Sequence, residues 1–131
     1  MANAITPFLM FDGQAEEALD FYVSLFADSE IEEIVHHGPA GVGQEGSVLR
    51  ASFRLQDQRV ICIDSPVKHP FTFTPSFSFF IDCDGEEEIE RLHLALSDGG
   101  VELMPMGHYG FSKKFAWIND RYGVSWQLNL P

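Results

Sequence analysis

Ile5–Asp28 reads ITPFLMFDGQAEEALDFYVSLFAD, and 70 positions later Pro75–Asp98 reads PSFSFFIDCDGEEEIERLHLALSD. Each stretch begins with an apolar run, which predicts a strand, and then turns at an Asp-Gly pair. Apolar residues at helical spacing follow, and acidic residues fall in the first turn, where the helix dipole favours them. Because strand, turn and helix register all agree, the sequence predicts a duplicated unit.

Three further strands are expected after each helix. In the first half they cover Ile31–His37, Ser47–Leu55 and Arg59–Asp64, and in the second half Val101–Met104, Lys113–Asn119 and Ser125–Leu130. The sequence therefore predicts an α+β fold, in which two tandem β-α-β-β-β modules form one curved mixed sheet with both helices outside. We expect a single domain over residues 1–131, with modules at about 4–65 and 76–131 and a connector at 66–75.

Charge and composition exclude several classes of protein. The chain of 131 residues carries 8 Lys plus Arg against 20 Asp plus Glu, a formal net charge of -12, which disfavours nucleic acid and anionic membranes. No apolar run reaches the length of a membrane-spanning helix, and the N-terminus lacks signal-peptide features. Cys62 and Cys83 lie in apolar runs, as expected of buried, reduced thiols. A cytoplasmic location is the expectation.

Alternation along the strands predicts one apolar and one polar face. In Ser47–Leu55 the apolar row is Leu49, Ala51, Phe53 and Leu55, and the other row is Val48, Arg50, Ser52 and Arg54. The last strand likewise separates Trp126, Leu128 and Leu130 from Ser125, Gln127 and Asn129. The apolar rows should contact the helices, and the polar rows should line the concave face, interleaved with Phe8, Phe80, Phe115 and Trp117. Such a face either meets water or forms a small-molecule pocket.

Several motifs resemble one known family. Ile5–Ala18, Phe21-Tyr22, Gly46–Leu49, Phe71–Pro75 and Trp117–Gln127 are similar to the motifs of PhnB-like proteins, often labelled 3-demethylubiquinone-9 3-methyltransferase. That branch belongs to the vicinal-oxygen-chelate superfamily, together with glyoxalase I, extradiol dioxygenases and bleomycin-resistance proteins. The resemblance implies a cup-shaped fold and a homodimer.

The resemblance also indicates where metal-dependent members carry their ligands. The four positions fall at Thr6 or Pro7, at Arg50 or Ser52, at Ser76, and at Gln127, where metalloenzymes have Glu. None of these is a carboxylate, imidazole or thiolate, so we expect no metal and no cofactor. The methyltransferase label finds no support either, because Gly41-x-Gly43 precedes a strand and lacks the third glycine of a dinucleotide-type loop.

Met104–Phe111 is rich in Met and aromatic residues and precedes Lys113-Lys114, so it is either a loop that closes over a ligand or a hairpin connection packed on the core. His108 in it is the one acid-base candidate, without an identifiable partner. His36-His37 are expected at an exposed strand end, and Arg50 and Arg54 either meet an anionic ligand or pair with a carboxylate such as Asp82. The predicted ligand-binding residues are Arg50, Ser52, Ser76, His108, Tyr109, Phe111, Trp117 and Gln127.

Three functions remain open from the sequence. The first is a metal-free protein that binds a small, partly aromatic or anionic molecule in the cup. The second is an enzyme that uses His108 or a displaced metal site. The third is an interaction module whose concave surface is covered by a partner chain.

Overall fold

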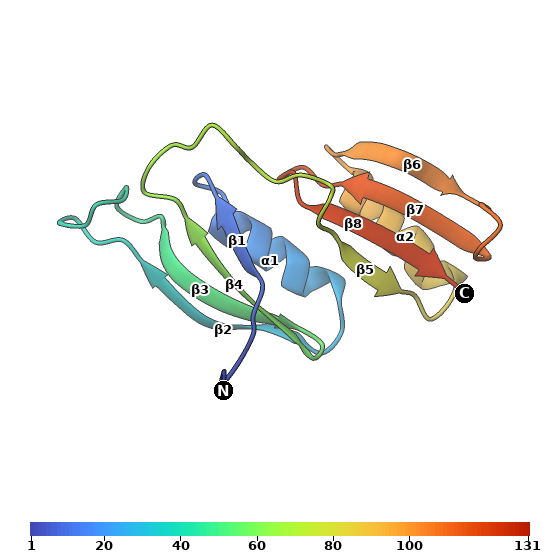
Figure 1. Ribbon diagram of the computed structural model, residues 1–131, viewed down its shortest axis with the longest axis horizontal. Coiled ribbons are helices and arrows are strands. Elements are labelled where there is room, and N and C mark those ends of the chain that lie inside the picture. The colour runs from blue at the N-terminus through green and yellow to red at the C-terminus, as the bar shows by residue number, and fades with distance from the viewer. The chain divides into compact units, whose positions relative to one another are not determined.

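The computed structural model describes residues 1–131, which form two compact units, Met1–Pro70 and Phe71–Pro131. Both units have the predicted element order (Figure 1). The first, module 1, contains β1 (Phe8–Phe11), α1 (Ala15–Leu25), β2 (Ser29–His36), β3 (Val48–Leu55) and β4 (Gln58–Asp64). The second, module 2, contains β5 (Phe79–Asp82), α2 (Glu86–Ser97), β6 (Val101–Gly107), β7 (Lys114–Asn119) and β8 (Ser125–Leu130).

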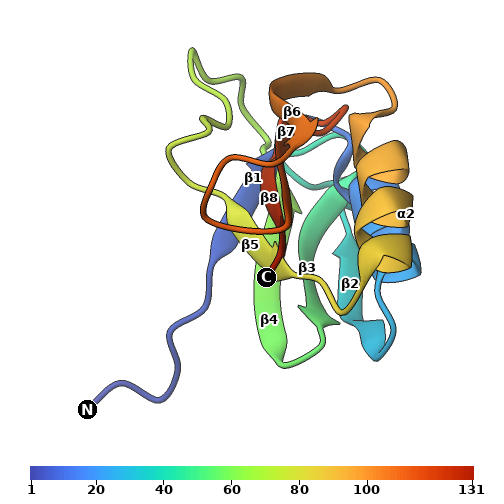
Figure 2. The ribbon, with the colours of Figure 1, turned by 90° about the vertical axis from the view of Figure 1, so that its right-hand side faces the viewer.

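The two sheets have the same topology, which confirms the predicted duplication. Their strand orders are β1-β4-β3-β2 and β5-β8-β7-β6. The first strand of each module runs parallel to the last, and the remaining pairs are antiparallel, so both sheets are mixed and the fold is α+β. Each helix packs on the strands of its own module, and Figure 2 shows α2 along one side of the module 2 sheet.

In module 1 the predicted helical stripe forms the core. Ala15, Ala18, Leu19 and Tyr22 are buried, and the ring of Tyr22 contacts that of Phe53 on β3 at 6.2 Å between centroids. Leu25 rather than Phe26 fills the last buried position of the helix, because α1 ends at Leu25 and Phe26 is already extended.

The predicted alternation of buried and exposed residues is wrong at the start of β3, because the strand contains a bulge there. His36 pairs with Val48 and Val35 pairs with Arg50, so Leu49 is left without a partner on β2. A bulge of this kind reverses the alternation beyond it. Val48 is consequently buried, whereas Leu49 is 48% exposed, the reverse of the predicted rows.

Module 2 is built in the same way. Ile89, Leu92 and Leu96 of α2 are buried, as are Ala116, Ile118, Trp126 and Leu128 on β7 and β8. The predicted loop Met104–Phe111 is shorter than expected, since β6 continues through two register shifts to Gly107. The connection between β6 and β7 is therefore only 108–113. Neither helix is long and apolar enough to cross a membrane.

Candidate functional site

The side of the module 2 sheet that faces away from α2 combines aromatic rings with amides. Alternation places Ala116 and Ile118 of β7 against the helix, so Phe115, Trp117 and Asn119 point to the opposite side. The strand registers then place two cross-strand rows on that side, Phe80–Gln127–Trp117 and Asp82–Asn129–Phe115. We call these six residues, together with Tyr109 and Phe111 from the β6–β7 turn, the aromatic face.

Three rings of the aromatic face gather around Phe115. Phe111 meets Phe115 edge-on at 4.9 Å between centroids, Tyr109 does so at 6.1 Å, and Phe80 lies 6.4 Å from Phe115 across the sheet. The hydroxyl of Tyr109 donates a hydrogen bond to the Pro105 carbonyl, which ties the turn to β6. Phe115 is only 3% exposed, whereas Phe80 and Phe111 remain 54% and 63% exposed. The cluster is thus ordered but still presents ring surface to solvent.

The polar groups of the aromatic face hold one another in fixed orientations. The Trp117 indole N–H donates to Ser125 Oγ at 2.8 Å, and the Gln127 amide donates to Ser78 Oγ at 2.8 Å. The Asn129 amide donates to Asp82 Oδ1 at 2.9 Å. These bonds leave the Gln127, Asn129 and Asp82 side chains each with an oxygen that accepts nothing from the protein.

Four of the predicted ligand-binding residues lie on the aromatic face, namely Tyr109, Phe111, Trp117 and Gln127. Ser76 lies before β5 in an exposed turn, where its hydroxyl bonds to that of Thr74, and Ser78 is the serine that reaches Gln127. Ser78, Phe80 and Asp82 occupy alternate positions, so strand alternation could have predicted that Ser78 and Asp82 lie on the same side as Phe80. Asn129 was already in the predicted polar row.

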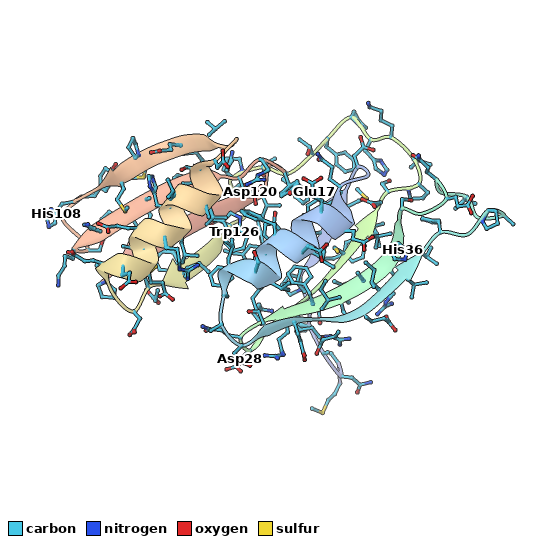
Figure 3. The ribbon with its side chains drawn as sticks, turned by 180° about the vertical axis from the view of Figure 1, so that it is seen from behind. Glu17, Asp28, His36, His108, Asp120 and Trp126 are labelled. Atoms are coloured by element: carbon cyan, nitrogen blue, oxygen red, sulfur yellow. The ribbon has the colours of Figure 1, made fainter.

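His108 begins the β6–β7 turn. Figure 3 shows it at the opposite end of the module 2 sheet from Asp120 and Trp126. The residue is exposed, and its ring makes no hydrogen bond or ion pair with an acid or a nucleophile. The geometry therefore supplies no group that would activate His108 as a catalytic base.

The corresponding face of module 1 carries the remaining predicted residues. Arg50 lies 3.7 Å from Glu33, and Arg54 bonds to Asp28 and Glu30, so their carboxylate partners come from the β2 side of the sheet rather than from Asp82. The contact with Glu30 raises the pKa of Arg54 further. Ser52 is buried, and its hydroxyl has no hydrogen-bond partner.

Two buried aspartates have structural roles that the sequence did not reveal. Asp64 at the end of β4 accepts hydrogen bonds from Gly13 N, Ala15 N and Val48 N, each at 2.9 Å, and so fixes the start of α1. Asp120 accepts from Tyr122 N, Val124 N and the Trp126 indole, while Gly123 has a φ of 92°. The closing motif that carries the family resemblance is therefore a turn held by a carboxylate, with Asp120 beside Trp126 (Figure 3).

We expected both histidines at the end of β2 to be exposed, and only one of them is. His36 is exposed and contacts Glu16 at 2.7 Å. His37 is buried, because the glycine-rich loop folds over its ring; a Cβ on Gly43 would lie 2.5 Å from Nε2. The loop that contains Gly41-x-Gly43 thus encloses an imidazole of the chain itself.

The side chains do not fit a metal ion, and the start of α1 does not fit a phosphate or a cofactor anion. No cluster of three His, Cys, Asp or Glu residues is placed to hold a metal ion, and the positions implied by the resemblance carry an amide, hydroxyls and Arg50. A helix N-terminus that follows a strand and a glycine could bind a phosphate or a cofactor anion. At α1 that place is taken by Asp64, whose Oδ1 already accepts from Gly13 and Ala15.

Both thiols are buried, as predicted. Burial raises the pKa of Cys62 to about 12, with a further contribution from Asp64. Burial also raises the pKa of Cys83, to about 11, with Glu88 adding to the effect. Neither has the low pKa or the exposure of a nucleophilic cysteine.

Comparisons with known proteins agree with this architecture. The family model described as 3-demethylubiquinone-9 3-methyltransferase matches residues 3–129, whereas no curated protein matches the chain. Among solved structures, a putative 3-demethylubiquinone-9 3-methyltransferase, PhnB protein, from Bacillus cereus is 53% identical, with a TM-score of 0.96 over 98% of this chain and 100% of that one.

Two more distant structures extend the likeness. Protein PA1353 from Pseudomonas aeruginosa is 25% identical, with a TM-score of 0.84 over 98% of each chain. A glyoxylase/bleomycin resistance protein/dioxygenase domain from Frankia is 10% identical, with a TM-score of 0.62 over 99% of this chain and 92% of that one, a likeness of fold alone. The resemblance inferred from the motifs is confirmed. The chain belongs to the 3-demethylubiquinone-9 3-methyltransferase family, that of the PhnB protein from Bacillus cereus.

Proposed function

We propose that this protein binds a small molecule on the aromatic face of module 2, without a metal ion. The observation that carries the proposal is the half-exposed ring cluster around Phe115, directly beside the oriented amides of Gln127 and Asn129. Concave or sheet-borne sites for small organic ligands combine aromatic walls with a few fixed polar groups in this way.

In this proposal the β6–β7 turn covers the ligand. Tyr109 and Phe111 project from it, stacked at 6.2 Å between ring centroids, and Gly110 has a positive φ of 93°. His108 begins the turn and would border the ligand. Arg50 and Ser52, on the corresponding face of module 1, remain proposed ligand-binding residues. Ser76 would contact the ligand only if its turn folds back over β5.

Metal-free binding is supported by the donor chemistry. An amide at 127 and hydroxyls at the other implied positions are poor ligands for a transition metal, and Arg50 would repel a cation. The methyltransferase description of the family is not proposed as an activity of this chain, because the start of α1 is filled by Asp64.

Native mass spectrometry of tag-free protein, purified without chelator, tests both parts of the proposal. We expect no bound metal and, where a ligand survives purification, extra organic mass on the chain. One metal ion per chain would contradict metal-free binding and favour an enzyme. The same spectra report the oligomer, for which we propose a homodimer in the cytoplasm.

Tryptophan fluorescence locates the binding site, because the chain has two tryptophans in different environments. Trp126 is fully buried against Asp120, whereas Trp117 is half-buried on the aromatic face. A panel of neutral, anionic and cationic aromatic compounds should include members that quench the wild type but leave Trp117→Phe unchanged. If no compound alters Trp117 emission and no organic mass is retained, the proposed function is wrong.

A further inference from the structure

We propose that the aromatic face selects a planar aromatic cation over neutral and anionic compounds of the same shape. The inference rests on the proposed function, and it goes further by naming the chemical class of the ligand. It follows from three observations on this face: which hydrogen-bonding atoms are still available, where the charged side chains lie, and how the rings are presented.

The first observation is that three oxygens of the face accept no hydrogen bond from the protein. The Trp117 N–H donates to Ser125, the Gln127 amide donates to Ser78, and the Asn129 amide donates to Asp82. The oxygens without a protein partner are Gln127 Oε1, Asn129 Oδ1 and Asp82 Oδ2, while each amide keeps a second N–H and the two serines keep their hydroxyl protons. Asn119, farther along the same side of β7, has a buried Oδ1 that accepts no hydrogen bond. Among these groups only the Asp82 carboxylate is charged, so it attracts a ligand that donates a hydrogen bond or carries positive charge, and it repels an anion.

The second observation concerns charge. Asp82 is exposed on β5, in the same cross-strand row as Asn129 and Phe115, and no cationic side chain bonds to it. Lys113, in the turn before β7, is exposed at the end of the face opposite to Gln127 and forms no ion pair, and Lys114 points to the helix side, where its ammonium contacts Glu90 at 3.0 Å. That hydrogen bond raises the pKa of Lys114 and holds its positive charge beside α2. The net charge of -12 adds a weaker, long-range preference for cations.

The third observation is the ring surface. Phe80 and Phe111 expose more than half of their surface, and Phe115 and Tyr109 hold Phe111 in place through ring contacts. The face of an aromatic ring has a negative electrostatic potential, so it attracts a cation within about 6 Å of its centre. The same face also stacks on a planar ligand. The rings and the Asp82 carboxylate on one surface therefore favour the same ligand, a flat cation.

Isothermal titration calorimetry with three probes of one shape tests the inference on the full chain. The probes are 1-methylquinolinium as the cation, quinoline as the neutral compound and 1-naphthoate as the anion. We expect 1-methylquinolinium to bind about 10-fold more tightly than quinoline, and 1-naphthoate to bind most weakly. The advantage of the cation should shrink as salt is raised, because the charge contact is exposed.

Two substitutions that remove one negative charge each separate local from long-range effects. Asp82→Asn keeps an oxygen for the Asn129 amide but removes the charge, and it should weaken 1-methylquinolinium about threefold while leaving quinoline unchanged. Glu87→Gln lies in the first turn of α2, exposed, and should leave both affinities unchanged. Phe111→Ala should weaken all three probes, since it removes ring surface from the site.

The outcomes separate the inference from the proposed function. If quinoline or 1-naphthoate binds as tightly as the cation and quenches Trp117, the selectivity for cations is wrong but binding on the aromatic face stands. Equal effects of Asp82→Asn and Glu87→Gln, or cation binding that Phe111→Ala does not weaken, also overturn the inference. Failure of the whole compound panel to alter Trp117 emission, together with the absence of retained mass, is the separate result that removes the proposed function.

Discussion

Module 1 and module 2 have the same topology but different chemistry on the side away from the helix. In module 1 that side presents Phe8 and Met10 of β1, Ile61 of β4, and arginines that pair with acids from β2. In module 2 it presents aromatic rings and oriented amides. The duplicated backbone determines the scaffold, whereas the residues at alternate strand positions differ between the copies and give one of them a candidate binding surface.

The modules also differ in how a buried carboxylate is used. Asp64 joins the last strand of module 1 to its helix and to the start of β3. In module 2 no side chain caps α2: Glu88 accepts from Asp84 N, which precedes the helix, and the buried carboxylate of Asp120 closes the β7–β8 turn instead. Both modules thus begin a helix after the Asp-Gly turn, but only module 1 has a buried carboxylate that accepts from the helix start.

The largest expected effect compares these carboxylates. Asp120→Ala removes three buried hydrogen bonds and should destabilise the fold by about 4 kcal/mol. Asp64→Ala should cost about 3 kcal/mol, because the N–H of Gly13 is only partly buried and water can replace the lost oxygen. Urea denaturation of both variants measures the difference. A loss below 1 kcal/mol in either would contradict the assigned role.

Close-packed glycines give the next effect. A Cβ on Gly100 would lie 2.3 Å from the Asn119 carbonyl oxygen, which is backbone, so Gly100→Ala should cost about 3 kcal/mol. A Cβ on Gly43 of module 1 would meet the His37 ring, a side chain that can move, and Gly43→Ala should cost about 1 kcal/mol. Thermal and urea unfolding rank the two variants. The reverse order would show that the loop over His37 is the more rigid region.

The bulge in β3, where the two modules diverge, predicts a smaller contrast. Val48→Ala empties a buried position and should cost about 2 kcal/mol, whereas Leu49→Ala should change stability by less than about 0.5 kcal/mol. The regular alternation predicted from the sequence requires the opposite order. Denaturant titration of the two variants distinguishes the alternatives.

The thiols give the smallest effect, a pH dependence at the alkaline end. Because the folded pKa values of about 12 for Cys62 and about 11 for Cys83 exceed the ordinary value of 9.0, each thiol stabilises the fold fully below pH 9. That contribution is lost as the pH rises through 11 and 12. Alkylation of the native protein at pH 8 should be slow at both sites and slower at Cys62. Rapid labelling of Cys62 would contradict its burial.

The features that the sequence predicts correctly and those that it does not have different physical origins. Helices, strand order and the alternation on β7 and β8 follow from local periodicity, so the residues Trp117, Gln127 and Asn129 were placed on one face correctly. Errors arose where a long-range contact overrides periodicity. The bulge at Leu49 and the continuation of β6 past Met104 depend on register with a neighbouring strand, and burial of His37 depends on a loop folding back.

By itself, the sequence determined that the protein is a duplicated β-α-β-β-β chain of the PhnB-like family, because a repeat and its turn residues are local signals. Only the tertiary structure decided that Asp64 reaches Gly13, distant in sequence, and that Ser78 rather than Ser76 orients Gln127. The same holds for the acceptors left unpaired on the aromatic face. Hydrogen bonds between side chains form by proximity in space, and periodicity assigns a residue to a face without assigning its partner.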